Sequence, residues 1–223
     1  MLIKLSGEAL GRAGLDPRAL ESISEQLCAA HRLAQIAVVI GGGNFIRGAS
    51  LAGLDRVVAD QMGMLATVLN GMALRYSLES KGIAVLLQSA IPVAYAAPLD
   101  PIEARRALAE KKLVIFAGGT GNPFVTTDTA AAIRASEIGA KVLLKATDVP
   151  GVYSADPKKN PKAKLYTELT LDEALEKRLH VMDLTALTIC RDNKITIRVF
   201  DVFGPGNLEK AVRGEPIGTV VRP

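Results

Sequence analysis

Residues 119–131 read GTGNPFVTTDTAA, and this stretch decides how the chain is expected to fold. The apolar residues 113–116 precede it and predict a short buried strand, while the alanine-rich residues after Asp128 predict the start of a helix. A strand, a glycine-rich turn and a helix N-terminus together aim backbone N–H groups at an anion. One such turn alone is more often an ordinary connection between a strand and a helix.

Two further turns of small residues follow apolar runs. Lys4-Leu5-Ser6-Gly7 comes directly after Leu2 and Ile3, and Gly41-Gly42-Gly43-Asn44 comes directly after residues 36–40. In an open parallel sheet, ligands bind at the carboxyl ends of the strands, so the three turns are predicted to line one crevice. No turn matches GxxxxGK[ST] or GxGxxG, and the common phosphate-loop and dinucleotide fingerprints therefore do not apply.

Apolar, β-branched runs recur along the chain, with helical patterns between them. The runs are residues 2–5, 36–40, 83–87, 113–116, 142–144 and 195–200. This alternation predicts an α/β fold with a mostly parallel sheet and helices on both faces. Asp100-Pro101 predicts a helix start, and Thr170 with Glu173 predicts a capping box. An apolar stripe over residues 62–76 indicates either core or an oligomer interface.

The composition favours a globular protein that binds small anions. Hydrophobic residues make up 49% of the 223 residues and charged residues 22%, which is enough for a full core. The net charge is +4 and aromatic residues are only 4%, so a nucleic-acid partner is not indicated. Cys28 and Cys190 are interpreted as buried thiols of a reducing compartment, and two distant histidines make a zinc site improbable.

The location predicted from the sequence is the cytoplasm. Lys4 and the Ser6-Gly7 turn interrupt the N-terminal apolar run, so no signal-peptide pattern is seen. The apolar stretch at residues 83–99 contains Gln88, Ser89 and two prolines, which makes it too broken to span a bilayer. We therefore expect a soluble protein that needs no membrane.

Two lysines at strand ends point to phosphoryl transfer. In that reaction the protein mainly positions the groups and stabilises the charge of the transferred phosphoryl with cations and N–H donors. Lys4 lies beside Ser6-Gly7 and Lys145 beside Thr147, where a single lysine would equally well extend to the sheet edge. Because there are two, we expect Asp128 to hold both ammonium groups in a fixed geometry, besides a possible role as a helix cap.

Taken in order, several longer motifs make the chain resemble the bacterial UMP kinases of the amino acid kinase family. The resemblance runs nearly end to end, and it implies a three-layer αβα sandwich around a mainly parallel sheet. It also implies a single domain, in which an N-terminal lobe (about residues 1–135) binds UMP and a C-terminal lobe (about 136–223) binds ATP. The motifs are KLSGEAL (4–10), GGGNFIRG (41–48), DQMGMLAT (60–67), GTGNPFVTTD (119–128), KAT (145–147), GVYSADP (151–157) and VMDL (181–184).

The resemblance assigns roles to individual residues. Lys4, Lys145 and Asp128 would be catalytic, and Arg75 would lie at an effector site. ATP would be bound by Lys4, Leu5, Ser6, Gly7, Gly43, Arg47, Thr147, Tyr153 and Asp156. UMP would be bound by Gly42, Asp60, Thr120, Gly121, Asn122, Pro123, Phe124, Val125, Thr126 and Thr127, with Asp60 accepting from the ribose hydroxyls.

The implied reaction transfers the γ-phosphate of ATP to UMP, giving UDP and ADP for pyrimidine nucleotide (CTP) biosynthesis. Mg²⁺ would be carried by the ATP phosphates, because no carboxylate cluster in the sequence indicates a metal site of the protein's own. The family resemblance further implies a homohexamer with GTP as activator and UTP as inhibitor.

Two alternatives remain open from the sequence. One is a kinase of the same fold with another acceptor, such as acetylglutamate, aspartate or carbamate, although GTGNPFVTTD and Asp60 argue against it. The other is a non-catalytic nucleotide-binding or sensor protein, which intact Lys4, Lys145 and Asp128 disfavour. Pro150 departs from the family, which often has aspartate there; proline removes a backbone donor and fixes φ, so the ATP-side loop is expected to differ in detail.

Overall fold

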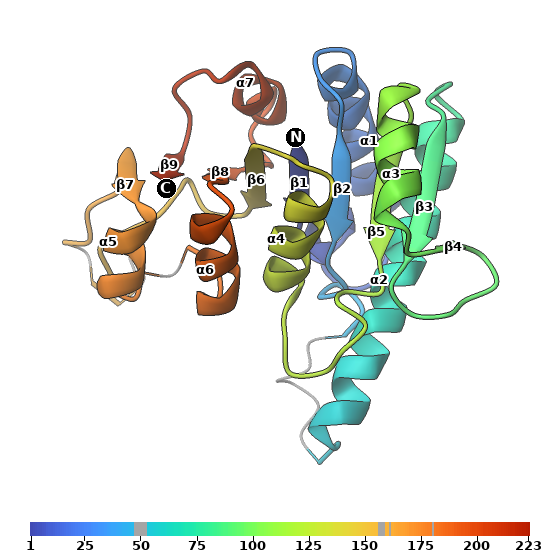
Figure 1. Ribbon diagram of the computed structural model, residues 1–223, viewed down its shortest axis with the longest axis horizontal. Helices are drawn as coiled ribbons and strands as arrows, with labels where there is room; N and C mark the ends of the chain where they lie inside the picture. The colour runs from blue at the N-terminus through green and yellow to red at the C-terminus, as the bar shows by residue number, and fades with distance from the viewer. Residues whose placement is uncertain (47–52, 156–158, 161, 180) are drawn as a thin grey trace.

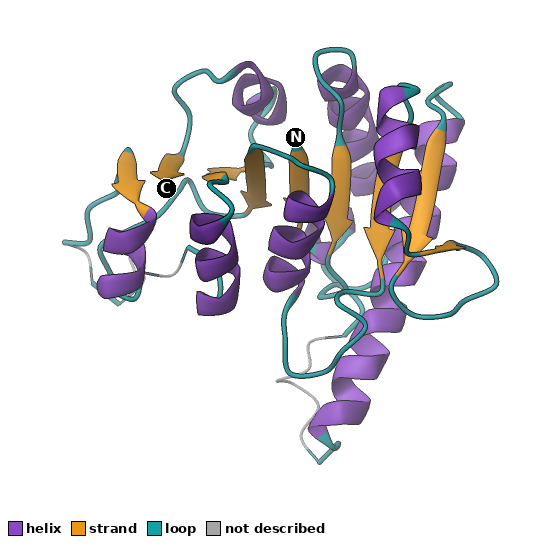
Figure 2. Ribbon diagram, in the orientation of Figure 1, coloured by secondary structure: helices purple, strands orange, loops and turns teal. Residues whose placement is uncertain are grey.

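The computed structural model describes residues 1–46, 53–155, 159–160, 162–179 and 181–223, and these form one nine-stranded sheet between two layers of helices (Figures 1 and 2). The strand order is β4-β3-β5-β2-β1-β6-β8-β9-β7, and every pair is parallel except β8 with β9. The strands are β1 (Leu2–Leu5), β2 (Ala37–Ile40), β3 (Val85–Ser89), β4 (Ala97–Pro98), β5 (Leu113–Ala117), β6 (Val142–Thr147), β7 (Glu168–Thr170), β8 (Thr196–Asp201) and β9 (Thr219–Arg222). The predicted mainly parallel α/β sandwich is therefore confirmed.

Most of the helices begin at a residue whose side chain caps the first turn. Asp16, Asp55, Asp100, Thr126, Thr170 and Asp183 each accept a hydrogen bond from a backbone N–H that the helix cannot satisfy. The helices are η1 (Gly7–Leu10, a 3₁₀ turn), α1 (Pro17–His31), α2 (Arg56–Glu79), α3 (Pro101–Ala109), α4 (Thr127–Glu137), α5 (Leu171–Glu176), α6 (Leu184–Asp192) and α7 (Asn207–Arg213).

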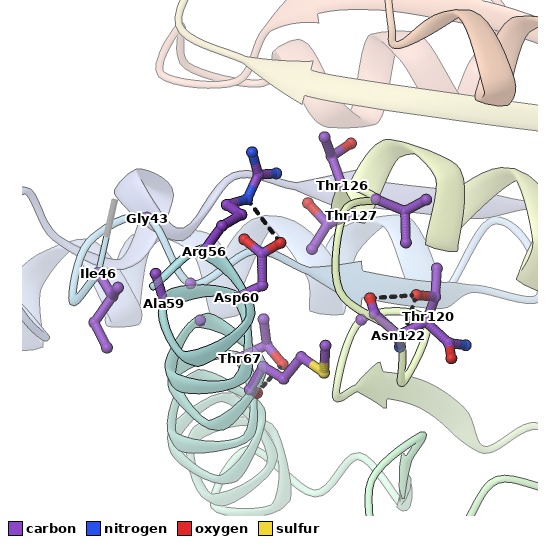
Figure 3. Close-up of a pocket in the computed structure, with 15 residues that line it drawn as sticks. Gly43, Ile46, Arg56, Ala59, Asp60, Thr67, Thr120, Asn122, Thr126 and Thr127 are labelled. Carbon is purple, nitrogen blue, oxygen red and sulfur yellow. Dashed lines mark hydrogen bonds and ion pairs between the residues drawn. The ribbon is translucent and has the colours of Figure 1, made fainter. Parts of the chain in front are cut away.

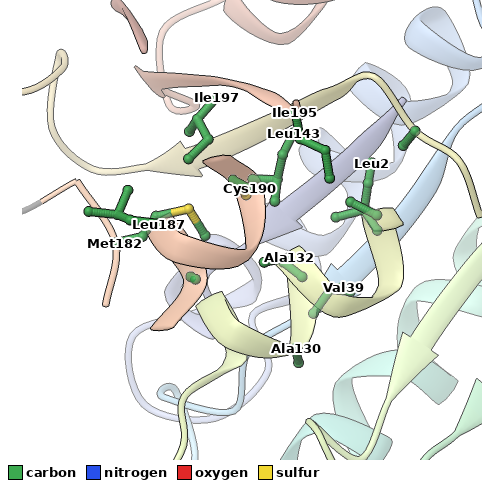
Figure 4. Close-up of a cluster of buried hydrophobic side chains, with 14 of the residues drawn as sticks. Leu2, Val39, Ala130, Ala132, Leu143, Met182, Leu187, Cys190, Ile195 and Ile197 are labelled. Atoms are coloured by element: carbon green, nitrogen blue, oxygen red, sulfur yellow. The ribbon is translucent and has the colours of Figure 1, made fainter. Parts of the chain in front are cut away.

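Two hydrophobic clusters, one on each face of the sheet, define the three layers. On one face, α3, α4, α5 and α6 cover side chains such as Leu2, Val39 and Leu143, and Figure 4 shows part of this cluster. On the other face, α1, α2 and α7 cover side chains such as Ile3 and Leu144. Alternate residues of β1 and β6 thus face opposite layers, as the pleat of a strand requires. The buried, free thiols of Cys28 and Cys190 lie in these two clusters, one in each.

Some element boundaries differ from those predicted. The strand expected at residues 83–87 is β3, Val85–Ser89, because Ile83 lies in the turn after α2. Asp128 does not cap α4: Thr126 is the capping residue, and Asp128 lies inside the first helical turn. Strands β4, β7 and β9 gave no clear signal in the sequence because they are two to four residues long.

Helix α2 has one face in the core and one face turned outward. Leu74 and Leu78 on it are fully buried, whereas Leu65 is 52% exposed and Tyr76 is 75% exposed. By length and mean hydropathy α2 could cross a membrane, but the core helix of a globular protein passes the same test. In this structure it packs against α1 and strands β3 and β5. The outward part of the stripe predicted over residues 62–76 is therefore not core of this chain.

Candidate functional site

Asp128 lies between the two lysines that the sequence analysis singled out. Lys4 Nζ is 2.9 Å from Asp128 Oδ1, and Lys145 Nζ is 2.8 Å from Asp128 Oδ2. Lys4 and Lys145 are register partners on the adjacent strands β1 and β6, so both side chains leave the same face of the sheet, beneath the start of α4. Lys145 Nζ also donates to the carbonyl oxygen of Val181, at 2.6 Å. The three side chains are only 12–16% exposed, so this is a partly buried charge cluster rather than a surface ion pair.

The charges of this cluster shift the ionisation of its members. Burial opposes ionisation of Asp128, but the ammonium groups of Lys4 and Lys145 outweigh burial and hold the pKa of the carboxyl group below its usual value. Burial lowers the pKa of Lys145, and the Asp128 carboxylate partly offsets that effect. Two ammonium groups around one carboxylate leave an excess of one positive charge, which suits a site for a phosphoryl group.

A cavity of about 310 Å³ opens beside this cluster, between α2 and the loop that leads into α4 (Figure 3). Its walls bring together residues from three regions that are distant in the sequence: the Gly41–Gly43 turn, the first turns of α2, and residues 119–127. The lining is Gly42, Gly43, Ile46, Arg56, Ala59, Asp60, Gly63, Met64, Thr67, Gly119, Thr120, Asn122, Val125, Thr126 and Thr127. Its volume lies in the range of small-molecule sites.

Seven of the ten residues predicted to bind UMP line this cavity, namely Gly42, Asp60, Thr120, Asn122, Val125, Thr126 and Thr127. Gly121, Pro123 and Phe124 do not line it. Gly121 has a φ of 83° and its Cα packs against the carbonyl of Ala90, so it shapes the turn behind the cavity. Phe124 lies at the rim, with its ring exposed and its backbone N–H bound to Asp60.

A buried pair of amides fixes the Gly41–Gly43 turn against α2. Asn44 and Asn70 exchange two side-chain hydrogen bonds, of 3.0 and 2.7 Å, and Asn70 also donates to the carbonyl oxygen of Gly41 at 2.7 Å. Gly42 itself has no room for a side chain, since a Cβ there would lie 2.8 Å from Ala66 Cβ. The close contact leaves the backbone of the turn as the surface that a ligand meets.

The residues predicted for ATP lie around the ends of β1, β6 and β8. Ser6 Oγ is buried without a partner in the described part of the chain, and Thr147 donates to Asp148 at 3.3 Å. A second cavity of about 330 Å³ is lined by Glu8, Arg12, Asp148 and Phe203, which follow these same strands. Leu5 is fully buried in the core, so only its backbone can contact a nucleotide.

Four other predicted residues either line neither cavity or lie outside the described residues. Tyr153 pairs with Leu165 through an isolated antiparallel bridge, in the segment after β6. Arg75 lies on α2 and donates to the carbonyl oxygen of Tyr95 at 3.2 Å. Arg47 and Asp156 lie outside the residues that the structure describes.

Three further side chains support the site through tertiary contacts. Asp183 accepts hydrogen bonds from Thr126 at 2.5 Å and from Thr129 at 2.7 Å, and it also caps α6. It therefore ties the first turn of α4, which carries Asp128, to α6. The other two, Arg56 and Asn70, were not predicted from the sequence. Asn70 could have been found because it is a polar residue on the apolar side of a predicted helix. No sequence pattern indicated Arg56.

The described residues offer no metal site of their own. No group of three or more histidine, cysteine, aspartate or glutamate side chains converges within them. Both oxygens of Asp128 already face ammonium groups, so this carboxylate is not available to ligate a cation. The residues present therefore fit a divalent ion that is held by nucleotide phosphates rather than by the protein.

The comparisons with known proteins agree with this geometry. The sequence model of the amino acid kinase family matches residues 1–201, and the chain belongs to that family. Within the family, the chain is 51% identical over 231 residues to the uridylate kinase of Methylococcus capsulatus, covering 99% of this chain and 95% of that protein.

Solved structures of UMP and uridylate kinases superpose on this chain. The UMP kinase from Bacillus anthracis superposes with a TM-score of 0.94 at 38% identity, covering 99% of this chain and 94% of that one. The UMP kinase from Ureaplasma parvum superposes with a TM-score of 0.93 at 34% identity, covering 100% and 97%. The uridylate kinase from Archaeoglobus fulgidus, at 31% identity and with 99% of each chain covered, has a TM-score of 0.78.

Proposed function

We propose that this chain is a nucleoside monophosphate kinase that transfers the γ-phosphate of ATP to UMP, giving ADP and UDP in pyrimidine nucleotide (CTP) biosynthesis. The observation that carries the proposal is the Lys4–Asp128–Lys145 cluster at the carboxyl ends of β1 and β6, beside a cavity walled by glycine turns. The 51% identity to a uridylate kinase and the similarity to UMP kinase structures support the choice of acceptor.

The donor and the acceptor nucleotide would occupy the two sides of the charge cluster. ATP is assigned to Lys4, Leu5 (through its backbone), Ser6, Gly7, Gly43, Arg47, Thr147, Tyr153 and Asp156. Of the described ones, residues 4–7 and Thr147 lie at the ends of β1 and β6, whereas Gly43 follows β2 and lines the cavity of Figure 3. UMP is assigned to the cavity of Figure 3, with Gly42 at its phosphate, Asp60 at its ribose and residues 120–127 around the uracil. The N-terminal lobe (about 1–135) would thus bind UMP and the C-terminal lobe (about 136–223) ATP.

In the reaction, an oxygen of the UMP phosphate attacks the γ-phosphorus of ATP in line, and the bond to the β-phosphate oxygen breaks. That acceptor oxygen is already ionised at neutral pH, so no general base is required. Lys4 and Lys145 supply positive charge to the transferred phosphoryl group, and Asp128 fixes the positions of both ammonium groups. A Mg²⁺ ion carried by the ATP phosphates would neutralise part of their charge.

The exposed apolar face of α2 supports an oligomer. Leu65, Leu69 and Tyr76 are each at least half exposed on this helix, and such a face is typical of a surface that another chain covers. We propose a cytoplasmic homohexamer built of dimers, with GTP as activator and UTP as inhibitor. Arg75, on the same helix, would contribute to the effector site.

A coupled assay of ADP release tests the proposed reaction. UMP, CMP, dUMP and N-acetylglutamate are offered as acceptors with ATP and Mg²⁺, with and without GTP, and UMP is expected to give the highest kcat/KM. Lys4→Ala and Lys145→Ala should each lower kcat about 100-fold while changing the KM values less, since they act on the transition state.

Three results would each contradict part of the proposal. Preferential turnover of N-acetylglutamate would indicate a different acceptor class. Tight UMP binding without ADP release would favour the non-catalytic sensor. Unchanged kcat in both lysine variants would remove the role given to the charge cluster.

A further inference from the structure

Arg56, Asp60 and Phe124 form a cluster at the rim of the acceptor cavity. One oxygen of Asp60, Oδ2, accepts from Arg56 Nε at 2.8 Å and from the backbone N–H of Phe124 at 2.8 Å. The guanidinium of Arg56 lies 5.8 Å from the centre of the Phe124 ring, within the range of a cation–π contact. Figure 3 shows Arg56 and Asp60 joined on the first turns of α2, facing the loop that precedes α4. The cluster thus ties that loop to the helix across 64 residues of sequence.

Phe124 needs such a tie because its own conformation is unfavourable. Its φ of 69° lies in the left-handed region, which residues with a Cβ adopt rarely. The residue is 66% exposed, so burial does little to keep it in place. The contacts that the structure gives it are the hydrogen bond to Asp60 and the stacking with Arg56, both from α2.

The same contacts fix the direction of the Asp60 carboxylate. Both hydrogen bonds end on Oδ2, and within the described residues Oδ1 has no partner. Burial opposes ionisation of Asp60, but the N–H of Phe124 and the Arg56 side chain outweigh it and lower the pKa of this carboxyl group. Asp60 is therefore an ionised acceptor with one oxygen occupied and the other open to the cavity that it lines.

We propose that Arg56 and Phe124 are positioning residues of the acceptor site, and that Arg56 makes this site selective for a ribonucleotide. Arg56 holds Oδ2 so that Oδ1 meets the ribose hydroxyls, and a 2′-deoxyribose at this position leaves the ionised oxygen with one donor fewer. Phe124 closes the loop over the acceptor through its backbone and ring. This inference rests on the proposed function, since it concerns how UMP is held.

Arg56→Met and Phe124→Ala separate the role of Arg56 in acceptor selectivity from the role of Phe124 in holding the loop over the acceptor. Arg56→Met keeps the length of the side chain but removes its donors, and it is expected to lower the preference for UMP over dUMP about tenfold, in kcat/KM and in binding affinity. Phe124→Ala keeps the backbone N–H and removes only the ring, so it should weaken the binding of UMP and of dUMP by a similar factor. Arg56→Lys, which retains one cationic donor, should restore part of the preference.

The matched control is Arg213→Met. Arg213 is also an exposed helical arginine that pairs with an acidic residue four positions away, Glu209, but it lies on α7 and does not line the acceptor cavity. Arg213→Met should leave kcat/KM and binding affinity unchanged for both UMP and dUMP. KM for ATP and the melting temperature are expected to stay at wild-type values in all four variants, because Arg56 and Arg213 are exposed and contribute little to folding.

Calorimetric binding of UMP and of dUMP without ATP keeps the two proposals apart. Equal preference for UMP over dUMP in wild type and Arg56→Met would overturn this inference even where UMP is phosphorylated. A wild-type chain that binds UMP but does not phosphorylate it would overturn the proposed function, while the binding ratio still decides the role of Arg56. A wild-type chain that binds neither nucleotide would overturn both.

Discussion

Replacement of Asp128 by asparagine should damage both stability and turnover. The carboxylate lies 2.9 and 2.8 Å from two ammonium groups, and at an effective dielectric constant of about 20 each contact represents about 6 kcal/mol of Coulomb attraction. Desolvation cancels much of this gain, and removal of one partner of a buried ionic group typically costs about 3–5 kcal/mol. Asparagine can accept from one lysine, but its NH₂ group then faces the other, so both ammonium groups lose their shared counter-charge.

The expected loss is about 3 kcal/mol in the free energy of unfolding at pH 7, which corresponds to a drop of about 6–12 °C in the melting temperature of a chain of this size. The kcat of UMP phosphorylation should fall about 100-fold, because lysines displaced by about 1 Å no longer meet the transferred phosphoryl group. Urea unfolding gives the first quantity and the ADP-release assay gives the second.

The pH dependence of this stability difference has a definite sign. The pKa of Asp128 is lowered in the folded chain, so its contribution is fully present above the unfolded carboxyl pKa of about 3.9 and is lost as the pH falls through the lower, folded value. The gap between wild type and Asp128→Asn should therefore be constant near pH 7 and shrink in strong acid. A gap that grew below pH 4 would contradict this assignment of the charge.

Asp192→Asn is the matched control, because Asp192 is exposed on α6 and, within the described residues, its one ion pair is with the neighbouring Arg191. It should change the free energy of unfolding by less than about 0.5 kcal/mol. If Asp128→Asn behaved like this control, or kept its kcat within about threefold of wild type, the carboxylate would not organise the lysines.

Four other substitutions test residues in and around the site. Gly42→Ala places a Cβ 2.8 Å from Ala66 Cβ, so KM for UMP should rise about tenfold. The Cβ of Gly43→Ala would have its nearest atom at 3.7 Å, so this variant should raise KM for UMP less, and steady-state kinetics compares the two. Asn70→Ala leaves its buried polar partners unsatisfied and should cost about 2–3 kcal/mol in urea unfolding; a cost below about 0.5 kcal/mol would mean that water replaces the amide. Asp183→Ala removes the cap of α6 and the link to α4, so we expect a loss of about 1–2 kcal/mol in urea unfolding together with a lower kcat, and an unchanged kcat would show that the link does not position Asp128.

The sequence was informative where local chemistry controls the structure. The strands Leu2–Leu5 and Leu113–Ala117 were predicted closely because the second is a continuous apolar run and the first is apolar except for Lys4, and turn residues follow both. The starts of α3 and α5 were predicted because their capping residues act on the backbone two or three positions away. The mainly parallel sheet followed from the alternation of such elements.

The sequence was less informative where distant segments meet. β8 (six residues) and β9 (four residues) pair antiparallel, and no local sequence pattern predicts this pairing. The hydrogen bond between Asp60 and Phe124 also depends on tertiary packing, so Arg56 could not be assigned from its own surroundings. That Lys4 lies opposite Lys145 depends on β1 and β6 being neighbours, which follows from strand order and not from spacing along the chain.

The register of β1 with β6 has a consequence for the biosynthesis of the protein. Lys4 is made well before its partner strand, which ends at Thr147. A nascent polypeptide that has emerged only as far as α3 therefore holds Lys4 but neither Asp128 nor Lys145. The charge cluster can form only when β6 lies beside β1, and we expect partly synthesised chains that lack β6 to be inactive.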